Sequence, residues 1–346
     1  EKYFFIPAMS SIYKDEKDQY DLEKKFVFIK RPDVKFGDWA QLFYDTYGEN
    51  GVIGMSFYIS ALFRDLIYSR FKFFPHLFHF GPPGTGKSTM CWSIQYMFGL
   101  ERKPFMLNAG TPVGFHRTFA QFRNAVVWFD EYNNSIEFKR VQDLKSAYDG
   151  AGHVKGEWSA SGGSSNRTTT TPVESACNIS GQELPIADNA LFKRCILLQY
   201  HQTIFSDAEK ERLNRLQKLQ EKGLSHITGA LTRFRQKMEA DYFKTFDEVE
   251  REILKALGED PTIESRIIKN MAVIATTFKV LRDELPWPWN WPKMLEVITK
   301  NIKSQNGLIS NAKETSQFWD QVEYCINEGE LRDQEDFKVE YLSSIK

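Results

Sequence analysis

The sequence is poor in cysteine and histidine, and it has no excess of charge of either sign. Its 346 residues include four scattered cysteines without a CxxC pair and six histidines that form no helical ligand pair with them. A disulfide framework and a structural zinc site are therefore not expected. Lys and Arg number 45 against 46 Asp and Glu, which gives a net charge of −1. A general attraction to nucleic acid or to an acidic membrane is absent, so any nucleic-acid contact has to be local.

Long apolar runs are also missing. No segment approaches the roughly 20 apolar residues needed to cross a bilayer, and the first residues do not form a charged and then apolar signal peptide. We therefore expect a cytoplasmic protein without a membrane partner. The first residue is Glu1 instead of Met, from which we expect a piece of a longer polypeptide.

Short β-rich runs alternate with helical patterns in the middle of the chain. Such alternation is typical of an α/β fold, in which crossover helices connect the strands of a parallel sheet. The predicted strands are His76–Phe80, Pro104–Leu107, Ala125–Phe129, Glu174–Ser180 and Cys195–Tyr200. His76 and His79 lie in the first of these strands, where ordinary packing and hydrogen bonding is the favoured interpretation.

Helical patterns flank this α/β core on both sides. Apolar residues at helical spacing predict helices over Gly37–Tyr47 and Val52–Phe71 before the core. After Ser206 they predict long helices, Ala208–Glu221, Thr228–Tyr242 and Thr262–Leu285. We therefore expect an N-terminal lead-in with helices over residues 1–72, the core over 73–203 and an all-α domain over 204–346. The loop Pro286–Pro292 carries three tryptophans, for which packing on neighbouring helices is favoured over stacking on bases.

A phosphate-binding motif follows the first predicted strand. The residues Gly81-Pro82-Pro83-Gly84-Thr85-Gly86-Lys87-Ser88 fit the pattern G-x-x-x-x-G-K-[ST], and Thr89 continues them into a predicted helix. Glycines let backbone N–H groups curl around phosphates, and the helix N-terminus favours an anion. This motif predicts ATP binding, with Lys87 at the β- and γ-phosphates and Ser88 as a ligand of Mg²⁺.

Two acids end another apolar run and complete the expected site. Ala125–Phe129 leads directly into Asp130 and Glu131, as a buried parallel strand ends at the sheet edge where ligands bind. Asp130 is the expected Mg²⁺ residue, and Glu131 is the expected base that orients and deprotonates the attacking water. An acidic pair after a strand is often only the start of a solvated loop, so its meaning depends on the phosphate loop.

The order of these motifs resembles an AAA+ ATPase of the superfamily 3 helicase type, found in phages, plasmids and integrated mobile elements. The resemblance covers about Phe74 to Tyr200. In that family a polar residue, usually Asn, positions the lytic water, and here Gln182 stands in its place, with Asn178 as the alternative. Arg194, in a basic segment before the last strand, resembles an arginine finger that acts on the ATP of a neighbouring subunit. Capping of a helix or pairing with an acid is the alternative for Arg194.

The family also carries a lysine-bearing helix, here around Lys145, and then a basic hairpin between the acidic strand and the polar residue. Two β-prone runs around a Ser/Gly turn make such a hairpin plausible here. The resemblance implies contacts from Lys145, Lys155 and Arg167 to the phosphates of single-stranded DNA in a ring, which is expected to be hexameric. An ordinary solvated surface is the alternative for these three residues.

Three functions are compatible with a phosphate loop followed by a pair of acids. The leading hypothesis is an ATP-hydrolysing, nucleic-acid-dependent motor, a ring-forming replicative DNA helicase of a mobile element that works with replication proteins. The second is an AAA+ regulatory ATPase that remodels or recruits a protein partner without unwinding DNA. The third, a metabolic kinase, is disfavoured by the pair Asp130-Glu131 and by the lack of a recognisable lid.

Overall fold

A computed structural model describes residues 31, 33–99, 103–120, 122–156, 168–186, 188–258, 260–327, 329–332 and 336–338. The chain divides into two compact units, residues 1–303 and residues 304–346. The sequence of the lead-in also predicts a strand at Phe26–Ile29, which lies outside the described residues. The three-part division of the chain made from the sequence stays a prediction.

The core is a five-stranded parallel sheet with the order β2-β3-β6-β1-β7. Its strands are β1 (His76–Phe80), β2 (Phe105–Met106), β3 (Val126–Tyr132), β6 (Ala176–Gly181) and β7 (Cys195–Gln199). All five occur within a residue or two of the predicted runs, apart from the extension of β3 through the acids. The α/β prediction is confirmed. The strands read as near-continuous apolar runs because helices cover both faces of the sheet.

Helices on opposite faces of the sheet are identified by two consecutive residues of β3. Trp128 lies 4.9 Å, between ring centroids, from Trp92 of α3 (Lys87–Gln95). The next residue, Phe129, contacts Phe115 and Phe119 of α4 (Pro112–Ala120) at 5.1 and 4.8 Å. Successive side chains of a strand point to opposite faces, so α3 and α4 cover different sides of the sheet.

The N-terminal helices divide at two places, of which the sequence predicted one. A kink at Gly48, where φ is 53° and ψ is −130°, interrupts α1 (Phe36–Ala61) between the predicted helices Gly37–Tyr47 and Val52–Phe71. A bend of 81° then separates it from α2 (Arg64–Phe71). The predicted single helix over Val52–Phe71 is therefore wrong. The spacing of apolar residues continues across the bend and does not show that the helix changes direction there. No single described helix is long and apolar enough to cross a membrane, whereas α1 and α2 pass that test only as a bent pair.

The C-terminal part of the first unit is helical, as predicted. It contains α7 (Asp207–Gln220), α8 (Ser225–Leu231), the 3-10 turn η5 (Thr232–Phe234), α9 (Arg235–Leu257), α10 (Ser265–Leu281) and the start of α11 (Trp291–Asn327). The Ser206 hydroxyl and the Glu209 carboxylate form a capping box at the start of α7. Gly258 ends α9 in a left-handed conformation.

The tryptophan-rich loop packs onto neighbouring elements. The rings of Trp287, Trp289 and Trp291 lie 4.9, 6.0 and 6.3 Å from the Phe278 ring of α10. Trp289 also contacts Tyr44 of α1. Packing was the favoured interpretation of these rings from the sequence, and it is confirmed.

His76 and His79 are buried in β1, as expected for packing residues. His76 Nε2 bonds the Leu144 carbonyl oxygen, and His79 Nδ1 bonds the Tyr200 hydroxyl. Burial lowers the pKa of His76 to about 4 and that of His79 to about 3. Both rings are therefore neutral near pH 7.

Candidate ATP site

The predicted phosphate loop and acids lie at one edge of the sheet. Because β1, β3 and β6 are parallel, their carboxyl ends lie at the same edge. β1 runs into Gly81, β3 contains Asp130, and β6 is followed by Gln182. Strand β6 lies between the other two, so residues more than 40 positions apart in the sequence become neighbours. This edge is where ligands bind in open α/β sheets.

The phosphate loop takes a conformation that depends on its glycines. Gly84 and Gly86 have φ of 76° and 89°, values that residues other than glycine rarely adopt. A Cβ on either residue would meet no atom within 4 Å, so open space surrounds this part of the loop. At Gly81, a Cβ would lie 2.3 Å from the Tyr200 carbonyl oxygen, so glycine is required by the close approach of β7. The loop then enters α3, whose N-terminus favours an anion.

Lys87 lies over the loop with its ammonium directed at backbone oxygens. Its Nζ donates to the carbonyl oxygens of Gly81 at 2.5 Å and Pro82 at 2.6 Å. Burial lowers the pKa of Lys87, an effect that the carboxylates of Asp130 and Glu131 oppose. Both carboxylates therefore stabilise the charged form of Lys87. Ser88, the next residue, is exposed.

The two acids of β3 form a β-bulge. Phe129 pairs with Ile179 and Tyr132 pairs with Gly181, so two acidic residues of β3 stand opposite one residue of β6. Glu131 has φ of 61°, an uncommon value for a residue with a side chain. The bulge leaves Glu131 exposed and Asp130 half-buried, so the two carboxylates have different surroundings.

Gly181 and Gln182 follow the bulge on the partner strand. A Cβ on Gly181 would lie 2.4 Å from the Tyr132 carbonyl oxygen, so the close contact of β3 and β6 requires glycine here. Gln182 is exposed directly after β6, between the ends of β1 and β3. The carboxylate of Glu183 accepts a hydrogen bond at 2.8 Å from the backbone nitrogen of Asn134, which ties together the loops after β6 and β3.

The residues at this edge fit a nucleotide with a divalent cation. The open glycine loop and the Lys87 ammonium suit a polyphosphate, while the Ser88 hydroxyl and the Asp130 carboxylate are the hard oxygen donors that Mg²⁺ takes together with phosphate oxygens. Among the described residues, no group of three or more His, Cys, Asp and Glu gathers into a metal site made by protein alone. The donor set therefore suits an ion that is shared with a phosphate ligand.

Arg194 lies at the opposite edge of the sheet. Its carbonyl oxygen accepts a hydrogen bond from His76 N at the start of β1, whereas the phosphate loop follows the end of β1. The five residues of β1 separate the two by about 16 Å. The guanidinium donates to Asp149 at 3.0 Å and to the Ala190 carbonyl oxygen at 3.1 Å, and the side chain is 15% exposed. Arg194 therefore cannot reach the phosphate loop of its own chain.

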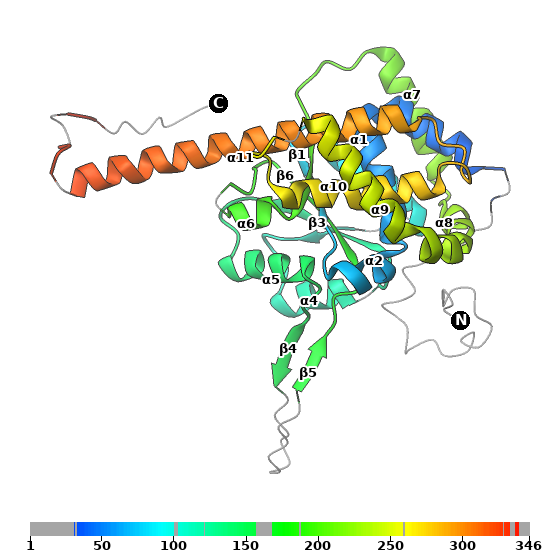
Figure 1. Ribbon diagram of the computed structural model, residues 1–346, viewed down its shortest axis with the longest axis horizontal. Coiled ribbons are helices and arrows are strands. Elements are labelled where there is room, and N and C mark those ends of the chain that lie inside the picture. The colour runs from blue at the N-terminus through cyan, green and yellow to red at the C-terminus, as the bar shows by residue number, and fades with distance from the viewer. Residues whose placement is uncertain are drawn as a thin grey trace, which may run out of the picture. The chain divides into compact units, whose positions relative to one another are not determined.

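The hairpin predicted between the acids and Gln182 is present in its described part. Strands β4 (His153–Gly156) and β5 (Thr168–Thr171) pair in antiparallel register and extend away from the sheet (Figure 1). Lys155 lies on β4, opposite Thr169. Arg167 lies outside the described residues.

Lys145 lies on a helix that precedes the hairpin, as the resemblance implies. It belongs to α5 (Phe138–Tyr148), and its ammonium forms an ion pair with Asp188 at 2.6 Å. The pair connects α5 to the short α6 (Asn189–Phe192) that precedes Arg194. Pairing with an acid, which the sequence did not predict, now accounts for the charge of Lys145.

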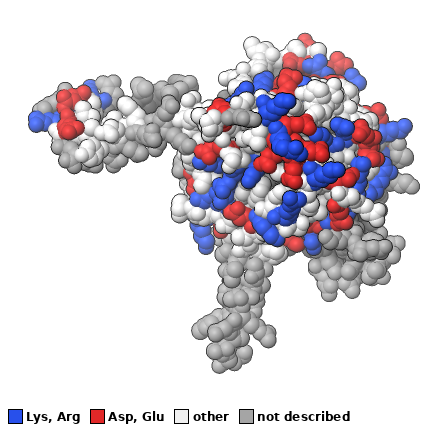
Figure 2. Space-filling model, viewed as in Figure 1, with Lys and Arg blue, Asp and Glu red and all other residues white. Residues whose placement is uncertain are grey.

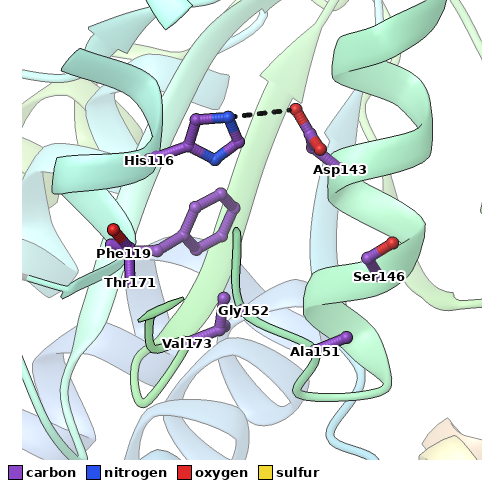
Figure 3. A pocket seen from close by; sticks show the side chains of 8 residues that line it. All are labelled: His116, Phe119, Asp143, Ser146, Ala151, Gly152, Thr171 and Val173. Atoms are coloured by element: carbon purple, nitrogen blue, oxygen red, sulfur yellow. Dashed lines mark ion pairs between the residues drawn. The ribbon is translucent and has the colours of Figure 1, made fainter. Parts of the chain in front are cut away.

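A small cavity of about 90 Å³ lies at the root of the hairpin. His116 of α4 faces Asp143 of α5 across it, with their nitrogen and oxygen atoms 3.4 Å apart (Figure 3). Gly152 and Thr171, which stand at the base of the two hairpin strands, also line this cavity. The base of the hairpin therefore lies beside α4 and α5.

Charges of both signs are mixed on one face of the protein. On the face shown in Figure 2, Lys and Arg are interspersed with Asp and Glu over the described residues. This agrees with the net charge of −1. The described residues of this face therefore form no single-sign patch that would attract nucleic acid.

Sequence reasoning missed two residues that are linked to Asp130. Ser180 donates its hydroxyl proton to Asp130 Oδ1, and Trp128 Nε1 donates to Ser180 Oγ at 2.7 Å. The alternation of β3 was a usable signal for Trp128, since it places residues 128 and 130 on the same face. Ser180 could not be found in this way, because strand order and the bulge decide its partner.

Comparisons with known proteins support this fold. Neither protein-family models nor curated proteins match the sequence. Among solved structures, the chain is similar to the SCCmec type IV Cch active helicase, with a TM-score of 0.63 and 17% sequence identity over 94% of this chain. The match spans 59% of the length of that helicase. A candidate ATPase from Cytophaga hutchinsonii is also similar, with a TM-score of 0.40 and 12% identity over 77% of this chain and 86% of the other. The chain therefore has a fold similar to that of this helicase.

Proposed function

We propose that this chain is an ATP-hydrolysing motor that depends on nucleic acid, a ring-forming replicative DNA helicase of the superfamily 3 type from a mobile element. One observation carries the proposal: the glycine loop with Lys87, the bulged acids Asp130 and Glu131, and Gln182 share one edge of a parallel sheet. The similarity in fold to an active helicase supports it. Single-stranded DNA, other copies of the chain and replication proteins are the proposed partners.

Each residue at this edge has its own proposed role in ATP hydrolysis. Backbone N–H groups of the loop and Lys87 hold the triphosphate, and Ser88 and Asp130 hold Mg²⁺, which neutralises charge on the phosphates when bound. Glu131 is exposed toward solvent, where it can take a proton from the attacking water. The amide of Gln182 orients that water with a hydrogen bond.

A second copy of the chain completes the site in this proposal. Arg194 is too far from its own phosphate loop, so it can act only on a nucleotide held by a neighbour. In that role its guanidinium neutralises charge that develops on the transferred phosphoryl group. Its bond to Asp149 has to open or turn outward when the neighbour binds. A closed ring, here a hexamer, gives every subunit such a neighbour.

The hairpin is the proposed DNA contact. It projects from the core and carries Lys155, and Arg167 directly precedes β5 in the sequence, so each subunit can bring a few cations to the phosphates of one strand. Lys145 is a weaker contact in this proposal, because Asp188 already neutralises its charge.

The test is ATP hydrolysis with and without single-stranded DNA. We expect DNA to raise turnover, and we expect Lys155→Ala and Arg167→Ala to lose this stimulation while ATP binding stays. The matched control is Lys139→Ala, because Lys139 is an exposed lysine of α5 and lies outside the hairpin. Unchanged turnover with DNA would refute the motor, and turnover stimulated by a protein without strand displacement would favour a regulatory AAA+ ATPase.

A further inference from the structure

We propose that Ser180 is a positioning residue for Asp130, and that the chain Trp128–Ser180–Asp130 sets the affinity of the nucleotide site for Mg²⁺. The inference rests on the proposed function, because it concerns the ion that accompanies ATP. Ser180 is fully buried in β6, two residues before Gln182, and no role was predicted for it from the sequence.

The direction of the hydrogen bonds in this chain is fixed by chemistry. An indole nitrogen can only donate, so the bond of 2.7 Å between Trp128 Nε1 and Ser180 Oγ uses the serine as acceptor. The single hydroxyl proton of Ser180 is then directed at Asp130 Oδ1. Asp130 Oδ1 is therefore the acceptor of this bond, and the bond fixes the orientation of the carboxyl group.

The β-bulge places Ser180 next to Asp130. It is the one residue of β6 that stands opposite the two acids of β3, between the pairs Phe129–Ile179 and Tyr132–Gly181. Asp130 Oδ1 also accepts a hydrogen bond at 2.9 Å from the backbone nitrogen of Glu131. Two donors therefore hold Oδ1, and Oδ2 accepts no hydrogen bond from the described part of the chain. Oδ2 is left to face a cation or one of its waters.

Trp128 connects this arrangement to the phosphate loop. Its ring meets Trp92 edge-on at 4.9 Å, and Trp92 lies on α3, the helix that begins at Lys87. The ring of Trp128, whose Nε1 donates to Ser180, thus contacts the helix that follows the phosphate loop. Loss of the serine hydroxyl frees the carboxylate to rotate, and it leaves the indole N–H buried without its partner.

The experiment measures the affinity for a fluorescent ATP analogue in EDTA and again in Mg²⁺. The ratio of the two dissociation constants reports how strongly the ion is held, without requiring hydrolysis. Hydrogen bonds to charged groups are strong enough for Ser180→Ala to reduce this ratio about tenfold, with affinity in EDTA unchanged. Ser180→Thr retains the hydroxyl and should restore the ratio. Trp128→Phe keeps an aromatic ring, removes the donor and should reduce the ratio about threefold, a smaller loss because the serine hydroxyl stays in place.

Circular dichroism of each variant verifies that it is folded, and Trp128→Phe provides a test that does not change the serine. A Ser180→Ala protein with the ratio of the parent overturns this inference and leaves the proposed function intact. A parent protein that binds no nucleotide in either condition overturns the proposed function and this inference with it.

Discussion

Replacing Gly181 by alanine tests the close contact between β3 and β6 that positions the acids. A Cβ at this position would lie 2.4 Å from the carbonyl oxygen of Tyr132, 2.9 Å from its Cβ and 3.1 Å from its carbonyl carbon. Two of these three atoms belong to the backbone, so no side-chain rotation relieves the overlap. The strands have to separate by about 1 Å at the bulge, next to Glu131.

The expected cost follows from this overlap. Overpacking of this kind lowers the free energy of unfolding by about 1–3 kcal/mol. With an m-value of about 2 kcal/mol/M in urea, a loss of about 2 kcal/mol moves the midpoint of unfolding by about 1 M. The same separation displaces the acids of β3 from the phosphate loop of β1, so we also expect turnover of ATP to fall.

Urea denaturation followed by circular dichroism measures the stability, and steady-state hydrolysis measures turnover. The control is Gly307→Ala in α11, where a Cβ would meet no atom within 4 Å. Alanine favours a helix over glycine by about 1 kcal/mol, so this variant should be as stable as the parent or more stable.

A Gly181→Ala protein that unfolds at the same urea concentration as the parent would refute the reasoning. Strands β3 and β6 would then not be in the close contact described, and the position of the acids would need another explanation. Equal destabilisation of Gly307→Ala would show that the assay does not report the local overlap.

Three further predictions concern the site and the core. Glu131→Gln should bind ATP with little turnover, measured by nucleotide binding and phosphate release, and normal turnover would remove its assignment as the base. Mixing Arg194→Ala with Lys87→Ala should recover part of the ATPase activity, because a mixed interface can combine one intact half from each variant; no recovery would argue against a shared site. The free energy of unfolding should fall as the pH drops from about 6.5 toward 4, because burial lowers the pKa of His76 and His79 and the unfolded chain takes up protons first. His79→Gln should reduce this pH dependence in urea titrations, and an unchanged slope would contradict the neutral buried ring.

Local patterns predicted much of the fold. The five core strands were found because both faces of a central parallel strand are buried, which gives short apolar runs. Helix boundaries were less accurate: the predicted gap between Tyr47 and Val52 contains the kink at Gly48, but the spacing of apolar residues does not show the bend before α2. The hairpin was predicted from its β-prone runs, and the pairing of His153–Gly156 with Thr168–Thr171 confirms its described part.

The sequence by itself determined the phosphate loop, because its glycines, Lys87 and Ser88 are contiguous and their chemistry needs only a strand before them and a helix after them. The tertiary structure alone decided which residues meet there. The strand order places β6 between β1 and β3, and the bulge opposes Ser180 to both acids across 50 positions of sequence. It also decided that Arg194 lies at the far edge, because hydrogen bonding in a parallel sheet fixes which ends of the strands come together.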